Sequence, residues 1–297
     1  MKALSLPRKI ALGAYLFVVG ILAVNIHIRM LEAGIPHPRG LWNEPSWYPF
    51  LKHLVQLMAM AWLHRMLKER FPTFGYWRNT LVLFAIMVTL MELTLRLPVT
   101  AGYVNGRAFL FTWTAAYLPE TITLFFSTAA VVLLASVRLK GSIHRVVVGV
   151  GLSVTAVLVW KASEPLAGRL AEVGARLFGP PNPQDVLAFP YGPTVTLIAS
   201  VSFIEPTVSC FAVGWLIWDR LSSNNGIRIL QFTLLILMLV YRLVDQTIFM
   251  IYSTLPPMRA FLSMGQFTLE WVFMGSMIPV AIIFLHRAEG TSKLNPD

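Results

Sequence analysis

The sequence is poor in cysteine and in the motifs that mark common cofactor and catalytic sites. Its 297 residues include one cysteine, Cys210, so no disulfide can form within the chain. The motifs Cys-x-x-Cys, Cys-x-x-Cys-His, His-Glu-x-x-His and Gly-x-Ser-x-Gly are absent, and so is the Asn-x-Ser/Thr glycosylation sequon. These absences remove the sequence signatures of c-type haem attachment, zincin metalloproteases and α/β-hydrolase-type serine enzymes.

Charge is also scarce. Charged residues make up 13% of the chain, against about 25% in soluble domains. Hydrophobic residues make up 56%, and they occur in runs of about 18 residues or more, the length that crosses a bilayer. The formal net charge of +10 does not indicate a nucleic-acid partner, because the basic residues flank the apolar runs and form no stripe. The positive-inside rule explains them better.

Eight apolar segments are predicted to span the membrane. They cover about 10–29, 49–64, 79–97, 108–136, 145–161, 192–217, 228–252 and 258–286. The first resembles a signal peptide but has no convincing cleavage site, so we expect an uncleaved span. With the N-terminus inside, more Lys and Arg residues fall on the cytoplasmic side, which predicts that both termini are cytoplasmic. We expect an all-α, polytopic membrane helix bundle over residues 1–297, in a bacterial inner (plasma) membrane.

The longest outer loop carries a helical pattern. Leu166, Leu170, Val173 and Leu177 recur at helical spacing, and Gly179 with the prolines after it ends the pattern. This predicts an amphipathic helix over about 163–178 that lies on the outer membrane surface or covers the bundle. The cytoplasmic loops are short, so we expect no soluble catalytic domain there.

Three glutamates, Glu120, Glu205 and Glu270, lie within predicted spans. The first two adjoin a proline, in Pro119-Glu120 and Glu205-Pro206. Each glutamate lies about 12 or 13 residues from the start of its span, and the three spans run the same way across the membrane. At about 1.5 Å per residue, each carboxylate lies about 18–20 Å into a hydrocarbon core about 30 Å thick. We therefore expect the three carboxylates to be level, near the midplane, and to line one polar cavity.

The remaining buried charges form two short-range pairs. Glu92 and Arg96 are four residues apart and Arg242 and Asp245 are three apart, so each pair shares a helix face. The predicted spans hold five acids against two bases: Glu92, Glu120, Glu205, Asp245 and Glu270 against Arg96 and Arg242. A net charge of about −3 at low dielectric is costly unless protonation, a bound cation or water relieves it. This excess of acid indicates proton or cation handling.

The two prolines beside glutamates have two interpretations. Pro119 and Pro206 have no N–H, so each leaves the carbonyl four residues earlier without its helical donor. Such carbonyls can bind a cation or substrate, as in the broken helices of transporters. The alternative is an ordinary kink, in which Thr121, Thr207 or neighbouring helices satisfy the backbone.

Two histidines could hold a cofactor. His27 ends the first predicted span and His53 begins the second, so both lie in the outer quarter of the membrane. Histidines in such positions can bind a haem or a metal ion. Histidines at helix ends are also common interfacial residues, and that alternative stays open.

Three functions fit this pattern, and the sequence favours the first. It is a transport-type protein, a carrier or channel-like subunit, that handles a proton, a cation or a cationic substrate. Its site residues would be Glu120, Glu205, Glu270, Asp245, Arg242 and Glu92. The second is a membrane-embedded redox or metal enzyme, or a haem-binding subunit, that uses His27 and His53 and acts on a lipid or quinone. The third is a non-catalytic subunit whose buried acids pair with partner membrane subunits. The cofactor is unknown from the sequence.

Overall fold

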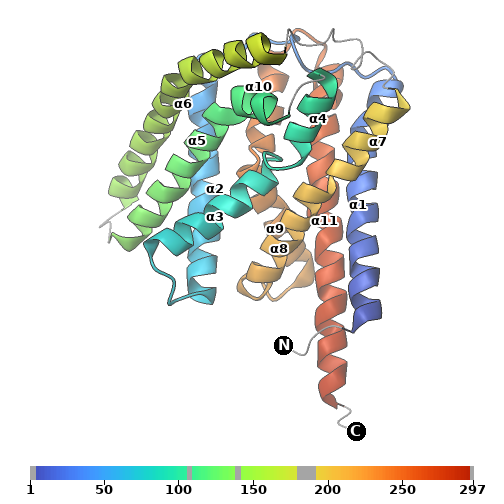
Figure 1. Ribbon diagram of the computed structural model, residues 1–297. Helices are drawn as coiled ribbons and strands as arrows, with labels where there is room; N and C mark the ends of the chain where they lie inside the picture. Colours follow the sequence, from blue (N-terminus) through green and yellow to red (C-terminus); the bar gives the residue numbers. More distant parts are fainter. Residues whose placement is uncertain (1–4, 106–108, 138–141, 179–191, 295–297) are drawn as a thin grey trace.

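The computed structural model describes residues 5–105, 109–137, 142–178 and 192–294 (Figure 1). All regular secondary structure in these ranges is helical. The α-helices are α1 (Leu6–Glu32), α2 (Tyr48–Arg70), α3 (Tyr76–Leu90), α4 (Arg96–Asn105), α5 (Phe109–Ser136), α6 (Ser142–Phe178), α7 (Pro193–Ser202), α8 (Ile204–Ile217), α9 (Asn225–Leu239), α10 (Arg242–Tyr252) and α11 (Pro257–Leu294). A 3-10 turn, Trp218–Arg220, follows α8.

The helices pack around two long elements, α11 and α2. Helix α11 contacts α1, α8, α9 and α10, whereas α2 contacts α5, α6, α8 and α9. At Gly275 of α11 a Cβ atom would lie 2.9 Å from Thr233 of α9, so these two helices approach closely there. The start of α1 and the end of α11 lie at the same end of the bundle (Figure 1).

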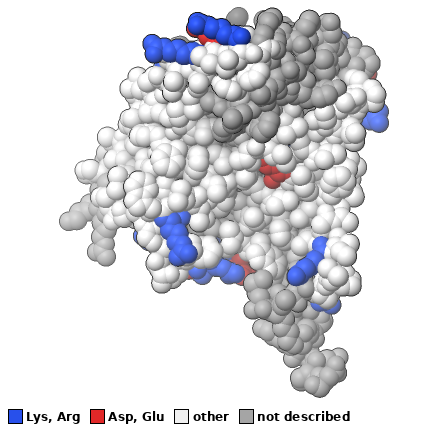
Figure 2. Space-filling view, viewed as in Figure 1, with Lys and Arg blue, Asp and Glu red and all other residues white. Residues whose placement is uncertain are grey.

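The chain is a multi-pass helical membrane protein by helix length and hydropathy. Among the described residues, five helices are long and apolar enough to cross a membrane: Leu6–Glu32, Tyr117–Ser136, Ile143–Phe178, Pro193–Arg220 and Pro257–His286. The pair α9–α10 passes the same test as one span, although it is bent by 67°. Figure 2 agrees with this assignment, because most charged residues on the face shown lie near the two ends, with a largely uncharged band between them.

Two of the eight predicted spans do not meet this test. Helix α2 (predicted span 49–64) is long enough, but it carries several charged and polar residues, among them Lys52, His53 and Gln56. The predicted span 79–97 is interrupted, because α3 ends at Leu90 and α4 begins at Arg96. The structure therefore supports five or six spans by length and composition.

Helix α6 differs from its prediction in another way. It continues from Ser142 to Phe178 through Pro165, so the amphipathic segment 163–178 is the second half of one helix. Figure 1 shows this part bending across the end of the bundle that lies away from the start of α1. A proline inside a helix removes one hydrogen bond and favours such a bend.

Candidate functional site

A cavity of about 510 Å³ lies where α3 gives way to α4 and α9 gives way to α10. Its polar lining consists of Lys52, Glu92, Arg96, Tyr117, Glu120, Tyr241, Arg242 and Asp245. Its apolar lining consists of Leu90, Met91, Leu93, Leu97, Pro119, Trp160, Val240, Phe267 and Trp271. This volume is typical of sites for small organic molecules.

Two unusual backbone conformations lie in the wall of this cavity. Glu92, just after α3, has a φ of 63°, and Tyr241, between α9 and α10, has a φ of 47°. Residues other than glycine adopt this left-handed region rarely. Such conformations cost about 1–3 kcal/mol each and cluster at functional sites, where the surrounding structure holds them. Because both conformations occur in the wall of the same cavity, this cavity is the candidate functional site.

The two predicted ion pairs are confirmed, and both lie in the cavity wall. Arg96 Nη1 donates to Glu92 Oε2, and Arg242 Nη1 donates to Asp245 Oδ2 at 3.1 Å. Asp245 also accepts a hydrogen bond from the Tyr48 hydroxyl. These contacts hold both guanidinium groups in fixed orientations.

Lys52 supplies a third base, which sequence analysis left out of the charge balance. Its ammonium group lies 4.0 Å from the ring centroid of Tyr241, 5.2 Å from that of Tyr48 and 6.0 Å from that of Trp160. These distances are in the range of cation–π attraction. Tyr241 in turn donates to Glu120 Oε1 at 3.2 Å. The missed signal was a lysine inside a predicted span, where charged residues usually serve a function.

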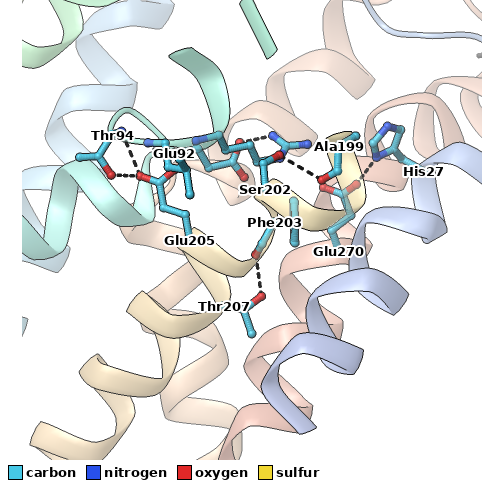
Figure 3. Close-up of polar contacts among 11 residues, drawn as sticks. His27, Glu92, Thr94, Ala199, Ser202, Phe203, Glu205, Thr207 and Glu270 are labelled. Atoms are coloured by element: carbon cyan, nitrogen blue, oxygen red, sulfur yellow. Dashed lines mark hydrogen bonds and ion pairs between the residues drawn. The ribbon is translucent and has the colours of Figure 1, made fainter. Parts of the chain in front are cut away.

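Glu205 is not part of the cavity lining, and its carboxylate binds the start of α4 (Figure 3). The backbone N–H groups of Thr94 and Leu95 each donate at 2.9 Å, and that of Arg96 donates at 2.5 Å. The Thr94 hydroxyl donates as well. The first N–H groups of a helix have no partner within it and form the positive end of its dipole. Glu205 therefore caps α4 from a different helix, α8.

Glu270 is engaged outside the cavity lining as well. His27 Nδ1 forms a hydrogen bond with Glu270 Oε1, and both side chains are buried. Figure 3 shows the Glu270 carboxylate turned toward His27, whereas that of Glu205 is turned toward Thr94. The His27 ring also stacks on Phe267, with centroids 5.2 Å apart, and so contacts the cavity wall from outside.

Of Glu120, Glu205 and Glu270, only Glu120 belongs to the lining of this cavity in the described part of the chain. Equal depth on helices that run the same way fixes the level of a side chain. It does not fix the direction in which that side chain points around the helix axis. The other predicted site residues, Glu92, Arg242 and Asp245, do line the cavity with Glu120.

The charge balance of the cavity lining differs from that of the predicted spans as a whole. Three acids in the cavity lining, Glu92, Glu120 and Asp245, are matched by three bases, Lys52, Arg96 and Arg242. The other two acids have partners of their own, backbone N–H groups for one and a histidine for the other. The charges of the cavity lining therefore balance by themselves, whereas the five acids of the predicted spans still outnumber the three bases by two.

A threonine near each of these prolines forms a hydrogen bond to the helix backbone. Helix α5 continues through Pro119, whereas Pro206 lies in the first turn of α8. The hydroxyls of Thr121 and Thr207 each donate to the carbonyl four residues earlier, at 2.9 Å and 2.8 Å. The acceptors are the carbonyls of Tyr117 and Phe203, not those four residues before each proline, so these bonds do not decide between the two interpretations.

The two candidate haem or metal ligands contact different helices. His27 is paired with Glu270 of α11, whereas His53 packs edge-on against Trp160 of α6, with centroids 5.8 Å apart. In the described part of the chain, no group of three or more His, Cys, Asp or Glu residues is placed to hold a metal ion. The haem or metal site expected at His27 and His53 gains no support from this arrangement.

A second hollow adjoins the cavity. It has a volume of about 230 Å³ and shares Lys52 and Trp160 with the cavity lining. Its other lining residues include Glu44, Lys161 and Glu164, and the Lys161 and Glu164 side chains are well exposed. Lys52 and Trp160 therefore stand between the cavity and an exposed polar hollow.

The cavity lining also carries unused hydrogen-bond donors. Arg96 Nε, Arg242 Nε and Trp271 Nε1 are buried and have no hydrogen-bond partner among the described residues. Buried polar groups in native proteins are nearly always paired. All three atoms are N–H donors, so their missing partner is an acceptor.

Comparison of the chain with protein-family models, with curated proteins and with solved structures gives no match.

Proposed function

We propose that this chain is a membrane transport protein that binds a small polar organic solute in the cavity between the two helix breaks. The observation that carries this proposal is the cavity of about 510 Å³, lined by three acids, three bases and five aromatic side chains. Binding sites for small molecules combine apolar and aromatic walls with a few placed polar groups. This combination suits an organic solute better than a bare ion.

The charge balance of the cavity narrows the class of solute. With three acids and three bases, a neutral or zwitterionic solute leaves the site neutral, whereas a lone cation adds an unmatched charge at low dielectric. The unused donors on Arg96, Arg242 and Trp271 favour a solute with an acceptor oxygen, such as a carboxylate or carbonyl group. We therefore propose a solute with an acceptor oxygen and an apolar or aromatic part.

The interrupted helices at the cavity are the reason to propose transport rather than binding alone. In secondary transporters, discontinuous helices commonly form the substrate site. Two helix pairs, α3–α4 and α9–α10, are interrupted at this cavity, and Lys52 and Trp160 separate it from an exposed hollow. The five buried acids all have partners within the chain, so the reason to expect bases from a partner subunit is weakened.

Binding can be tested with purified protein and a panel of amino acids, mono- and dicarboxylates and amines. A solute that binds the folded state raises the midpoint of thermal unfolding. We expect at least one amino acid or carboxylate to raise it for the wild type and not for Glu120→Gln or Lys52→Gln. Matched controls are Glu172→Gln on α6 and Lys9→Gln on α1, whose exposed side chains lie outside the cavity lining and outside the adjoining hollow.

Transport is tested separately, by uptake of the radiolabelled solute into liposomes that contain the protein. Uptake that is lost in Glu120→Gln and kept in Glu172→Gln would support the proposal. Binding without uptake would contradict a transport role, and an unfolding shift that persists in both cavity variants would contradict the site itself.

A further inference from the structure

One face of α2 changes from apolar to basic along its length. Its apolar part carries residues at helical spacing, Leu54, Leu57, Met58 and Ala61. The same face continues one turn later with His64, Arg65 and Lys68. Leu54 and His64 are ten residues apart, about 15 Å along a helix, which is half the thickness of the hydrocarbon core. This face therefore matches one leaflet of a bilayer, from its apolar interior to its headgroups.

The apolar part of this face forms one wall of a groove of about 760 Å³. The second wall comes from α5 and includes Val131, Leu134 and Ala135. The third comes from α6 and includes Val148, Gly149 and Leu152, with Arg145 at the start of that stripe. The groove is apolar along its length and has a basic side chain at one end, which fits an acyl chain and its headgroup.

A separate basic hollow, of about 510 Å³, continues the groove at its basic end. The two share Ala61 and Ala135 in their linings. The hollow is also lined by His64, Arg65, Lys68, Glu69 and Pro72. The groove and this hollow therefore form one continuous site along α2, apolar first and basic afterwards.

The positive charge at this end is not neutralised by the protein. Glu69 is bound by Arg220 at 3.1 Å. Among the described residues, no acidic side chain forms an ion pair with Arg65, Lys68 or Arg145. Three unpaired bases beside an apolar groove complement a ligand with an anionic head and an apolar tail.

We propose that this continuous surface is a binding site for an anionic glycerophospholipid. One acyl chain lies in the groove between α2, α5 and α6, and the phosphate is bound by Arg65, Lys68 and Arg145. The site lies on the face opposite to α1 and near the end of the bundle where α1 begins (Figure 1). It is separate from the solute cavity, since the two linings share no residue, so the two proposals can fail independently.

The test uses the full chain in detergent, with phosphatidylglycerol and phosphatidylcholine that carry the same acyl chains. Native mass spectrometry measures how much of each lipid stays bound. We expect the wild type to prefer phosphatidylglycerol, and Arg65→Gln/Lys68→Gln to weaken that binding by at least about tenfold, since each basic residue near an anionic headgroup contributes about 1 kcal/mol, or about fivefold. Phosphatidylcholine binding should change little.

The control pair is Arg8→Gln/Lys9→Gln, which removes the same charge at the same end of the bundle, from α1. Unchanged phosphatidylglycerol binding in this control supports the proposal. An equal loss in both pairs would mean that surface charge alone attracts the lipid, and would overturn it. Displacement of the lipid by millimolar inorganic phosphate, at constant ionic strength, would assign the basic hollow to free phosphate and would also overturn it.

The apolar part of the site is tested by filling the groove. A Cβ at Gly149 would meet only Leu54, at 3.9 Å, so Gly149→Ala is a folding control for Gly149→Phe. Ala61→Trp is a second filling variant, at an exposed position that lines both hollows. We expect loss of both lipids in the folded filling variants. Retention of phosphatidylglycerol in both, or a dimer of the chain that only these variants break, would overturn the proposal.

Discussion

Two segments of this chain look alike in sequence and differ in structure. Glu120 follows a proline in α5, and Glu205 precedes one in α8. The Glu205 carboxylate accepts three backbone N–H groups and one hydroxyl. That of Glu120 accepts one hydroxyl, from Tyr241 at 3.2 Å, and lines a cavity. Protein donors saturate the Glu205 carboxylate, whereas the Glu120 carboxylate keeps capacity for a ligand.

The number of protein donors around a buried carboxylate decides how much of it remains open to a ligand. A carboxylate has about four lone-pair positions, and four donors fill those of Glu205. Such a group stabilises structure and offers little to a solute. A buried carboxylate becomes a functional candidate when the surrounding side chains leave part of its capacity unused next to a cavity, as at Glu120.

The largest effect should come from the saturated carboxylate. We expect Glu205→Ala to lower the free energy of unfolding by about 3–5 kcal/mol, because the backbone N–H groups of Thr94, Leu95 and Arg96 at the start of α4 lose their acceptor. Thermal or denaturant unfolding of the purified protein measures this. Thr94→Val, which removes only the hydroxyl donor, should cost much less. A Glu205→Ala protein as stable as the wild type would contradict the capping role.

Glu270 provides a third case, because among the described residues it has one side-chain partner, His27, and it lies outside the cavity lining. His27→Ala should cost about 2–3 kcal/mol of unfolding free energy, since it leaves a buried carboxylate without its partner. Combining His27→Ala with Glu270→Gln in a double-mutant cycle should show strong coupling. Additive losses would mean that the pair does not stabilise the fold.

Replacement of Glu120, the carboxylate in the cavity, should affect solute binding more than stability. Glu120→Gln should change the free energy of unfolding by less than about 1 kcal/mol, because the amide oxygen still accepts from Tyr241. The same variant should lose the solute-induced rise in unfolding midpoint. Glu205→Gln, measured in parallel, should lower the free energy of unfolding by more than Glu120→Gln does. If Glu120→Gln unfolds as readily as Glu205→Gln, the two carboxylates play the same role.

The prolines should matter least. Pro206 lies in the first turn of α8, where a backbone N–H has no partner within that helix. Pro206→Ala should therefore change the free energy of unfolding by less than about 1 kcal/mol. A loss as large as that expected for Glu205→Ala would mean that the proline, more than the carboxylate, sets the geometry between α8 and α4.

Much of the fold follows from the sequence, because long apolar runs can only be buried as membrane helices. The predicted spans correspond to helices or helix pairs, and the Arg242–Asp245 ion pair follows from helical spacing. Glu92 and Arg96 pair as well, but Glu92 lies between α3 and α4 and shares no helix face with Arg96. The breaks at Glu92 and Tyr241 could not be predicted, since both residues adopt a backbone conformation that their own types disfavour. Tertiary contacts hold these breaks, and local propensity gives no sign of them.

The site was predictable only in part, for a related reason. Depth along a helix is set by residue count, so Glu120, Glu205 and Glu270 could be placed at one level. Direction around the axis depends on how each helix is rotated in the bundle, which the sequence does not specify. Lys52 could have been included from its place in a predicted span, which would have reduced the counted excess of acids over bases from three to two.

The contrast between Glu120 and Glu205 can be tested most directly by cysteine labelling. Cys210 is the only cysteine and is fully buried, so Cys210→Ala gives a cysteine-free background. Single cysteines are then placed at Glu120, in the cavity lining, and at Thr207, which is buried beside Glu205 with no exposed surface. A charged, water-soluble methanethiosulfonate reagent should label Glu120→Cys rapidly and leave Thr207→Cys unreacted in the folded protein. Equal protection of both cysteines would contradict the presence of an accessible cavity at Glu120.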